Sequence, residues 1–323
     1  MESHTGFRLN ALSTLILTMV ESTVALTVPP NFNFWRTVFS HGWCELVPFY
    51  VSRERKELER TLMLPRRTPV HCILREDRSS IAVTVQSPRP LTPVQVENAG
   101  RQLKACLRLD EDLAPFHDEA NRYPEFRWVC ETGSGRLLRA PTVFEDAVKM
   151  LLTTNCTWAL TTMMITNLVR AVGERLDETH WTFPGPEAVA SLTERALRAK
   201  IKTGYRSPFL HKMARDVAEG KLDVESWRTS SLPTPDLYEE IRKVKGLGPY
   251  AAGNLLRLVG RCDYLALDSW VRQQYFKLHR KGRTVKDATI ERDYQKFGIW
   301  RGLFFWLEMT KEWHDEGGNA PIG

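Results

Sequence analysis

The sequence predicts an α+β protein in which a small antiparallel β-sheet domain precedes an all-α domain. Three observations support this. Short β-branched runs end near residue 87, helical periodicity begins at Pro93, and no strand pattern recurs after Pro141. The chain has 323 residues, which is enough for two domains. We expect the first domain at residues 1–110 and the second at residues 111–323.

The strands of the first domain are predicted from alternating or β-branched runs at residues 23–28, 70–74 and 80–86, which turn signals separate. A helix follows from Pro93 to about Asp110, because Val96, Leu103 and Leu107 recur at helical spacing. Residues 111–141 read as a connector that is rich in proline and glycine. The rest is helical in pattern, and a last helix is expected from about Trp300 to His314.

The apolar stretch at residues 12–20 needs a separate interpretation. Glu2 and His4 precede it, and it is far shorter than the ~20 apolar residues of a membrane helix. We interpret it as an extension of the first domain, and a start at Met19 is an alternative. No other segment is apolar enough to span a membrane, so no membrane partner is expected.

The cysteines point away from metal and disulfide chemistry. The six cysteines are scattered and form no CxxC pair. This spread favours reduced thiols over a disulfide framework or a zinc site, and it excludes the closely spaced cysteines of an iron–sulfur cluster.

Charge is distributed unevenly along the chain. The net charge is +6, yet residues 195–286 contain 20 Lys and Arg against 9 Asp and Glu. The remaining residues are slightly acidic. A basic half predicts a polyanionic partner that docks on one face, while a chance imbalance on a solvated surface is the alternative.

The strongest local motif is the segment from Val244 to Asn254, VKGLGPYAAGN. It predicts two helices joined by a hairpin with Gly246 and Gly248, and the second helix starts at Pro249. Amide groups at a helix start bind anions, which suits one phosphate of a DNA strand. The positive charges of Arg242, Lys243 and Lys245 surround this hairpin. An ordinary helix–turn–helix connection is the alternative.

Twenty residues after Gly248, Asp268 ends a short apolar run and precedes a predicted helix at Ser269. Aspartate is a favoured helix N-cap, so a capping role alone would explain it. Its distance from the hairpin favours a catalytic role.

Together the hairpin and Asp268 resemble the helix–hairpin–helix (HhH-GPD) DNA glycosylase superfamily. Residues 203–206 (TGYR) resemble a helix of 8-oxoguanine glycosylases, and residues 151–156 (LLTTNC) stand where these enzymes carry the loop that fills the gap left by a flipped base. Residues 107–117 (LRLDEDLAPFH) are similar to a linker of bacterial 3-methyladenine DNA glycosylase II. The similarity covers roughly residues 90–315 and implies an all-α glycosylase domain.

The resemblance implies a mechanism. Breaking an N-glycosidic bond develops positive charge on the sugar, which a carboxylate stabilises while it orients water. Asp268 is the candidate for both roles. Bifunctional members carry a Schiff-base lysine where this sequence has Tyr250, so hydrolysis without strand cleavage is expected. Lys149 replaces the glutamate of adenine glycosylases, and Phe305 replaces the glutamine with which 8-oxoguanine enzymes read the base.

The same resemblance gives candidates for contacts with DNA. The backbone candidates are Gly246, Gly248, Lys245, Tyr250 and Arg272. The candidates for the base pocket or the wedge are Asn155, Thr154, Trp158, Tyr205, Tyr250, Trp270 and Phe305. Core packing is the alternative for each aromatic residue, and helix capping is the alternative for Asn155.

The predicted function is therefore a monofunctional base-excision DNA glycosylase, with an alkylated purine as the first base. An 8-oxoguanine glycosylase, a mismatched uracil or thymine glycosylase, and a non-catalytic binder of DNA damage are the alternatives. The expected partner is double-stranded DNA with a damaged base, and the protein is expected to act as a monomer in the cytoplasm, at the nucleoid, if it is bacterial. No cofactor is required. A structural monovalent cation at the hairpin, held by the backbone carbonyls of Arg242, Val244 and Leu247, is implied by the family.

Overall fold

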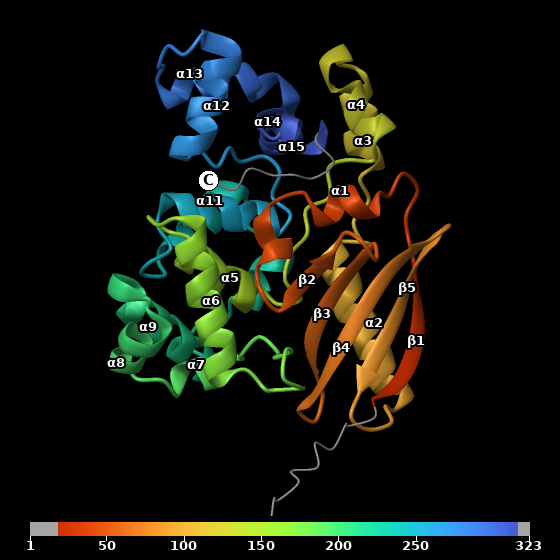
Figure 1. The fold of residues 1–323 in the computed structure, drawn as a ribbon. Coiled ribbons are helices and arrows are strands. Elements are labelled where there is room, and N and C mark those ends of the chain that lie inside the picture. The colour runs from red at the N-terminus through yellow and green to blue at the C-terminus, as the bar shows by residue number, and fades with distance from the viewer. Residues whose placement is uncertain (1–18, 316–323) are drawn as a thin grey trace, which may run out of the picture.

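The computed structural model describes residues 19–315 (Figure 1). Most of the apolar stretch at residues 12–20 therefore lies outside the described residues, although Val20 already begins the first strand. Within the described part, no helix combines the length and the apolar character needed to cross a membrane.

The N-terminal part is a five-stranded sheet in which all neighbouring strands are antiparallel, in the order β1-β5-β4-β3-β2. The strands are β1 (Val20–Thr27), β2 (Phe49–Ser52), β3 (Glu57–Leu64), β4 (Thr68–Asp77) and β5 (Ser80–Ser87). The helix α2 (Pro93–Leu107) packs against this sheet (Figure 1). The expected α+β class, with a small antiparallel sheet followed by helices, is confirmed.

Two strands, β2 and β3, were not predicted from the sequence. In β3 the charged residues Glu57 and Arg60 are buried, so they interrupt the alternation that marks a half-buried strand. Each has a charged partner: Glu57 lies 2.5 Å from Arg75, and Arg60 lies 2.5 Å from Glu145. Glu57 also pairs with the nearby Arg55 at 2.8 Å, but Arg75 and Glu145 lie on other elements, so a local pattern could not indicate those partners.

The predicted helix at Pro93 is confirmed, with an earlier end. Thr92 caps α2 through a capping box with Gln95. Arg108 follows the helix in the left-handed region at φ 54° and ends it at Leu107, three residues before the expected end.

The rest of the described chain is helical apart from one isolated bridge between Arg175 and Trp181. The helices outside the sheet are α1 (Phe34–Val38), α3 (Ala114–Asn121), α4 (Arg127–Glu131), α5 (Val143–Leu152), α6 (Trp158–Val172), α7 (Pro186–Ala190), α8 (Glu194–Ala196), α9 (Ser207–Ala218), α10 (Thr234–Arg242), α11 (Pro249–Leu258), α12 (Ser269–Arg280), α13 (Asp287–Tyr294), α14 (Arg301–Met309) and α15 (Lys311–Asp315). The connector contains α3 and α4, and the expected last helix is divided into α14 and α15.

The buried apolar side chains form two cores. One core joins the sheet and α2 to helices α5–α7 and α9–α11, and the other joins α3 and α4 to α12–α14. In Figure 1 the second group of helices lies above the first. The first core thus crosses the expected boundary at residue 110, and the division into domains at that residue stays a prediction.

A buried charge network also joins the sheet to the helices. The carboxylate of Glu145 on α5 lies 2.5 Å from Arg60 on β3 and 2.7 Å from Lys149 one helical turn later. Lys149 is fully buried, so its amine is committed to this network.

Candidate active site

A cavity of about 990 Å³ lies where the two cores meet. Its walls come from α5, the loop after α5, α11, the start of α12, α14 and α15, together with residues 41–43 that precede β2. Most of the residues singled out from the sequence line it. These are Thr154, Asn155, Trp158, Tyr205, Gly246, Gly248, Tyr250, Asp268, Trp270 and Arg272.

Asp268 lies at the cavity as the N-cap of α12. Its Oδ1 accepts a hydrogen bond from the Val271 amide at 2.9 Å. The segment before Asp268 packs directly on α14. The two approach so closely that a Cβ on Gly302 would lie 2.1 Å from the Tyr264 carbonyl oxygen. The capping alternative is therefore real, but it uses one carboxylate oxygen only. No hydrogen bond to Oδ2 is present among the described residues.

The hairpin between α10 and α11 is confirmed, and α11 starts at Pro249 as expected. Gly246 has φ 96°, and a Cβ there would lie 2.6 Å from Leu151 and 2.7 Å from Phe209. Only glycine fits this close approach to α5 and α9. Gly248 is different, because its φ is −72° and a Cβ would meet nothing within 4 Å. The space in front of Gly248 is open to a ligand.

One face of α11 turns polar residues toward the cavity. Tyr250, Asn254 and Arg257 follow one another at spacings of four and three residues, so they share a helix face, and all three line the cavity. Burial raises the pKa of the Tyr250 phenol, with the nearby Asp268 carboxylate acting in the same direction. Tyr250 therefore stays neutral at physiological pH.

Arg257 is a buried cation that forms no ion pair with a carboxylate within residues 19–315. It is 4% exposed, and its Nε and Nη2 have no hydrogen-bond partner among the described residues. Its guanidinium lies 4.2 Å from the centre of the Trp306 ring. Burial lowers its pKa to about 10, and Asp268 opposes that shift. The group remains charged at neutral pH.

The end of α11 is held by the connector. Arg108 donates to the Arg257 carbonyl oxygen at 3.2 Å, and Arg139 donates to the Leu258 carbonyl oxygen at 3.3 Å. Both arginines pair with Glu111 at 2.5 and 2.9 Å. Residues 107–117, which resemble a family linker, thus fix the position from which Arg257 enters the cavity.

Residues 41–43 close the cavity from the side of the sheet. The His41 ring stacks on Trp43, with centroids 4.9 Å apart, and neither ring nitrogen of His41 has a hydrogen-bond partner in the part of the chain that the structure describes. Burial lowers the pKa of His41 to about 3, and Arg257 adds to that shift. His41 is therefore neutral. The sequence reading missed this segment, because it lies more than 200 residues from Asp268 in the chain.

The loop after α5 and the 203–206 segment form one unit at the rim. Asn155 is exposed in the left-handed region at φ 46° and donates to the Tyr205 hydroxyl at 3.2 Å. Arg206 is 3% exposed and donates to the Thr154 and Asn155 carbonyl oxygens. The Arg206 guanidinium also lies 4.5 Å from the Tyr205 ring centre. The guanidinium of Arg206 thus holds the backbone of both candidate wedge residues, Thr154 and Asn155.

Five tryptophans line the cavity, and one of them is Trp43, on which His41 stacks. Trp158 lines one side, with its Nε1 donating to Glu45 at 2.9 Å. On the other side Trp270 packs on Trp313 at 4.8 Å, and Trp306 lies beside both.

The placement of Phe305 in the pocket is wrong. Phe305 is fully buried in the second core, where its ring packs 5.0 Å from Tyr294, and it does not line the cavity. Its neighbour Trp306 does line it. One position along a helix changes the direction of a side chain by about 100°, so Trp306 faces the cavity where Phe305 does not.

The candidates for backbone contact differ in their freedom. Arg242 and Lys243 pair with Glu239 and Glu240 within α10. Lys245 is exposed, and no ion pair to it is found among the described residues. Arg272 binds Asp287 through two hydrogen bonds of 2.7 and 2.8 Å, so a contact of Arg272 with DNA would need this pair to open.

The cation at the hairpin stays a prediction. Of the three carbonyl groups assigned to it, that of Val244 accepts a hydrogen bond from the Leu247 amide at 3.0 Å. A carbonyl oxygen has a second lone pair, so this bond does not prevent coordination.

Comparison with known proteins places this site in a family. Residues 148–303 match the family model of the HhH-GPD superfamily base excision DNA repair proteins. A DNA-3-methyladenine glycosylase of Bacillus subtilis (strain 168) is 24% identical over 243 residues, which cover 71% of this chain and 80% of that protein.

Solved structures share the fold over nearly the whole chain. A 3-methyladenine DNA glycosylase from Archaeoglobus fulgidus gives a TM-score of 0.69 at 16% identity, covering 91% of this chain and 99% of that one. The Clostridium acetobutylicum 8-oxoguanine glycosylase/lyase gives 0.69 at 18% identity, covering 90% and 98%. The latter has also been solved with double-stranded DNA. Residues 148–303 therefore form a segment of the HhH-GPD type found in base excision DNA repair proteins, and the chain is a DNA N-glycosylase.

Proposed function

We propose that the protein is a monofunctional glycosylase that hydrolyses the N-glycosidic bond of a damaged base flipped out of double-stranded DNA. In this reaction the base leaves with the bonding electron pair, and a water oxygen forms the new bond to C1′ of the sugar. Asp268 stabilises the positive charge on the sugar and takes a proton from the water.

The observation that carries the proposal is the composition of the cavity. Asp268 lines it, while no lysine is found among the described residues that do so. Tyr250 occupies the position from which a family lysine would form a Schiff base, and its phenol cannot form one. Lys149 is buried in its own charge network, and Lys245 lies outside the lining. Strand cleavage by a lyase step is therefore not expected.

The remaining contacts follow from the same geometry. Asn155, supported by Thr154 and Tyr205, fills the gap left by the flipped base. Gly248, Lys245 and the start of α11 bind the DNA backbone. We expect the protein to act as a monomer at the nucleoid if it is bacterial, without a required cofactor.

An alkylated purine is the first candidate for the base. The cavity walls of Trp158, Trp270, Trp306 and Trp313 suit an electron-poor ring, which stacks well on aromatic faces. The relatives from B. subtilis and A. fulgidus carry the name of 3-methyladenine glycosylases.

A neutral base with a carbonyl group is the second candidate, and Arg257 favours it. Its guanidinium lines the cavity and would donate to a carbonyl oxygen of hypoxanthine, 8-oxoguanine, uracil or thymine. The same positive charge would repel a purine that alkylation has made cationic. The two candidates thus make opposite predictions for the removal of the Arg257 charge.

The decisive experiment is base release from duplexes that each carry one lesion, with alkaline cleavage as the readout. The panel holds alkylated purines, hypoxanthine, 8-oxoguanine, and uracil or thymine opposite guanine. Wild type should release at least one base and need alkali to cut the strand, and Asp268→Asn should lose release by roughly 10²–10⁴-fold while still binding DNA. Arg257→Met should slow release of a carbonyl base but leave or improve release of a cationic purine.

Three outcomes would overturn parts of the proposal. Strand cleavage without alkali would contradict the monofunctional assignment. Unchanged release by Asp268→Asn would remove Asp268 from the chemistry. Binding without release by wild type, for every lesion, would favour the non-catalytic reader of DNA damage.

A further inference from the structure

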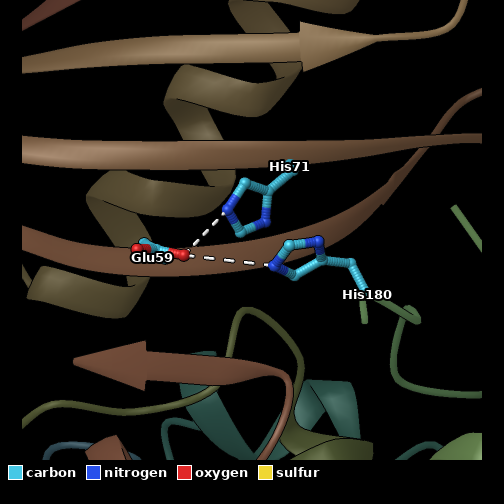
Figure 2. Close-up of side chains that lie close together, drawn as sticks. All are labelled: Glu59, His71 and His180. Atoms are coloured by element: carbon cyan, nitrogen blue, oxygen red, sulfur yellow. Dashed lines mark hydrogen bonds and ion pairs between the residues drawn. The ribbon is translucent and has the colours of Figure 1, made fainter. Parts of the chain in front are cut away.

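A second cluster of functional side chains lies outside the cavity, where the sheet meets the loop between α6 and α7. Figure 2 shows Glu59 from β3, His71 from β4 and His180 from that loop turned toward one another. Glu59 Oε2 lies 3.0 Å from His71 Nε2 and 4.0 Å from His180 Nε2. One ligand atom from each residue lies within 4.8 Å of the other two.

The outer nitrogens of both histidines already have partners. His180 Nδ1 lies 2.7 Å from Asp177 Oδ2, and His71 Nδ1 lies 3.3 Å from Thr61 Oγ1. Histidines that bind metals commonly donate their second ring nitrogen to a carboxylate or another oxygen, which fixes the tautomer and directs the free lone pair to the ion. Both Nε2 atoms are directed toward Glu59 in the same way (Figure 2).

A simple hydrogen-bond network explains this arrangement less well. It accounts for the contact between Glu59 and His71, and for a second contact of Glu59 with Arg55 at 2.5 Å. It leaves His180 Nε2 at 4.0 Å from the carboxylate, which is beyond hydrogen-bond length. It also brings the two imidazole rings to a centroid distance of 3.9 Å without a group that would hold them together.

The distances fit a small divalent ion. Ligands at about 2.0–2.1 Å from zinc in a tetrahedral site lie roughly 3.3 Å from one another. The distances from Glu59 Oε2 to His71 Nε2 and His180 Nε2, 3.0 and 4.0 Å, lie on either side of that value. Two imidazoles and one carboxylate are ligands that suit zinc, and three protein ligands leave the fourth position to water.

We propose that Glu59, His71 and His180 form a divalent metal site of the zinc type that joins the sheet to the loop between α6 and α7. None of the three residues lines the catalytic cavity, so the ion would act on stability. The contacts of Tyr50 with Thr179 (3.2 Å) and of Arg67 with Glu174 already join the sheet to this loop. A metal would make that connection much stronger.

The test uses the full chain, free of any histidine tag and stripped with a chelator, titrated with zinc chloride in a calorimeter. We expect one zinc ion per chain and a melting temperature that rises with zinc. His180→Gln removes one of the three ligands. Because His180 is a partly exposed loop residue, the variant is expected to fold, but it should neither bind zinc nor gain stability from it. Asp177→Asn keeps all three ligands and should weaken binding by about 10–100-fold. Cobalt in place of zinc should give visible absorption bands in wild type and none in His180→Gln.

A matched control is His279→Gln. His279 Nε2 lies 3.2 Å from Glu308, so this pair has a histidine and a carboxylate but belongs to no three-ligand cluster among the described residues. It should bind zinc as wild type does. Equal zinc binding by wild type and His180→Gln, or no binding by wild type, would refute the metal site.

Discussion

Replacing Arg257 with methionine is expected to stabilise the protein, although it removes a buried side chain. Methionine has a similar length and no charge, so the space stays filled. The guanidinium that it replaces has no carboxylate within ion-pair distance among the described residues, and two of its nitrogens have no hydrogen-bond partner. Its main compensation is the Trp306 ring at 4.2 Å.

The magnitude follows from the pKa of Arg257. A pKa of about 10 instead of 12.5 means that folding disfavours the charged form by about 3 kcal/mol, at about 1.36 kcal/mol per pKa unit. The methionine variant regains this cost and loses a cation–π contact of ~0.5–2 kcal/mol. The free energy of unfolding should therefore rise by ~1–3 kcal/mol. Because the folded pKa is the lower one, the cost applies at every pH below it, so the gain should be constant from about pH 6 to about pH 9.

The assay is denaturant unfolding of wild type and of two variants, Arg257→Met and Arg60→Met. Arg60 is the matched control, because it is equally buried and lies 4.4 Å from the Phe49 ring centre, but it pairs with Glu145 through two hydrogen bonds. Arg60→Met leaves the buried Glu145 carboxylate without its arginine partner, so the variant should be destabilised by roughly 3–5 kcal/mol. Loss of stability in both variants would refute the reasoning, since Arg257 would then have a partner that the geometry does not show.

Two further predictions concern the hairpin. Gly246→Ala should destabilise the protein by ~1–3 kcal/mol, because its Cβ would overlap Leu151 at a positive φ. Gly248→Ala changes an open position, so this variant should have the stability of wild type but bind DNA less tightly. Equal stability of the two variants would contradict this prediction. Lys245→Ala should lower the slope of log binding constant against log salt by about 1, whereas Lys243→Ala, whose amine is paired with Glu240, should change it less. An unchanged slope in Lys245→Ala would remove Lys245 from the phosphate contacts.

The sequence predicted the parts of the site that local patterns encode. The hairpin, the start of α11 at Pro249 and the cap at Asp268 each depend on residues within a few positions of one another. A glycine at positive φ, a proline in the first turn and an aspartate before a helix are recognisable without any tertiary contact.

The missed parts depend on contacts between distant segments. His41 reaches the cavity only because residues 41–43 fold against α5 and α14, and nothing near it in sequence indicates this. Arg257 did carry a signal, since it lies on the same face of α11 as Tyr250 and Asn254, in an otherwise apolar stretch. Strand β3 was missed for the opposite reason, because its buried charges look like surface residues until their partners on other elements are known.

Asp268 shows why a local pattern predicted the position of the catalytic candidate but could not choose its role. The capping and catalytic interpretations require the same residue at the same place, and the geometry makes them compatible. Oδ1 is held by the Val271 amide, which fixes the carboxylate at the rim of the cavity, and Oδ2 keeps its lone pairs for the sugar or the water. The cap is therefore an argument for the catalytic role, because a carboxylate that must stabilise a transient charge works best when its orientation is fixed before the substrate arrives.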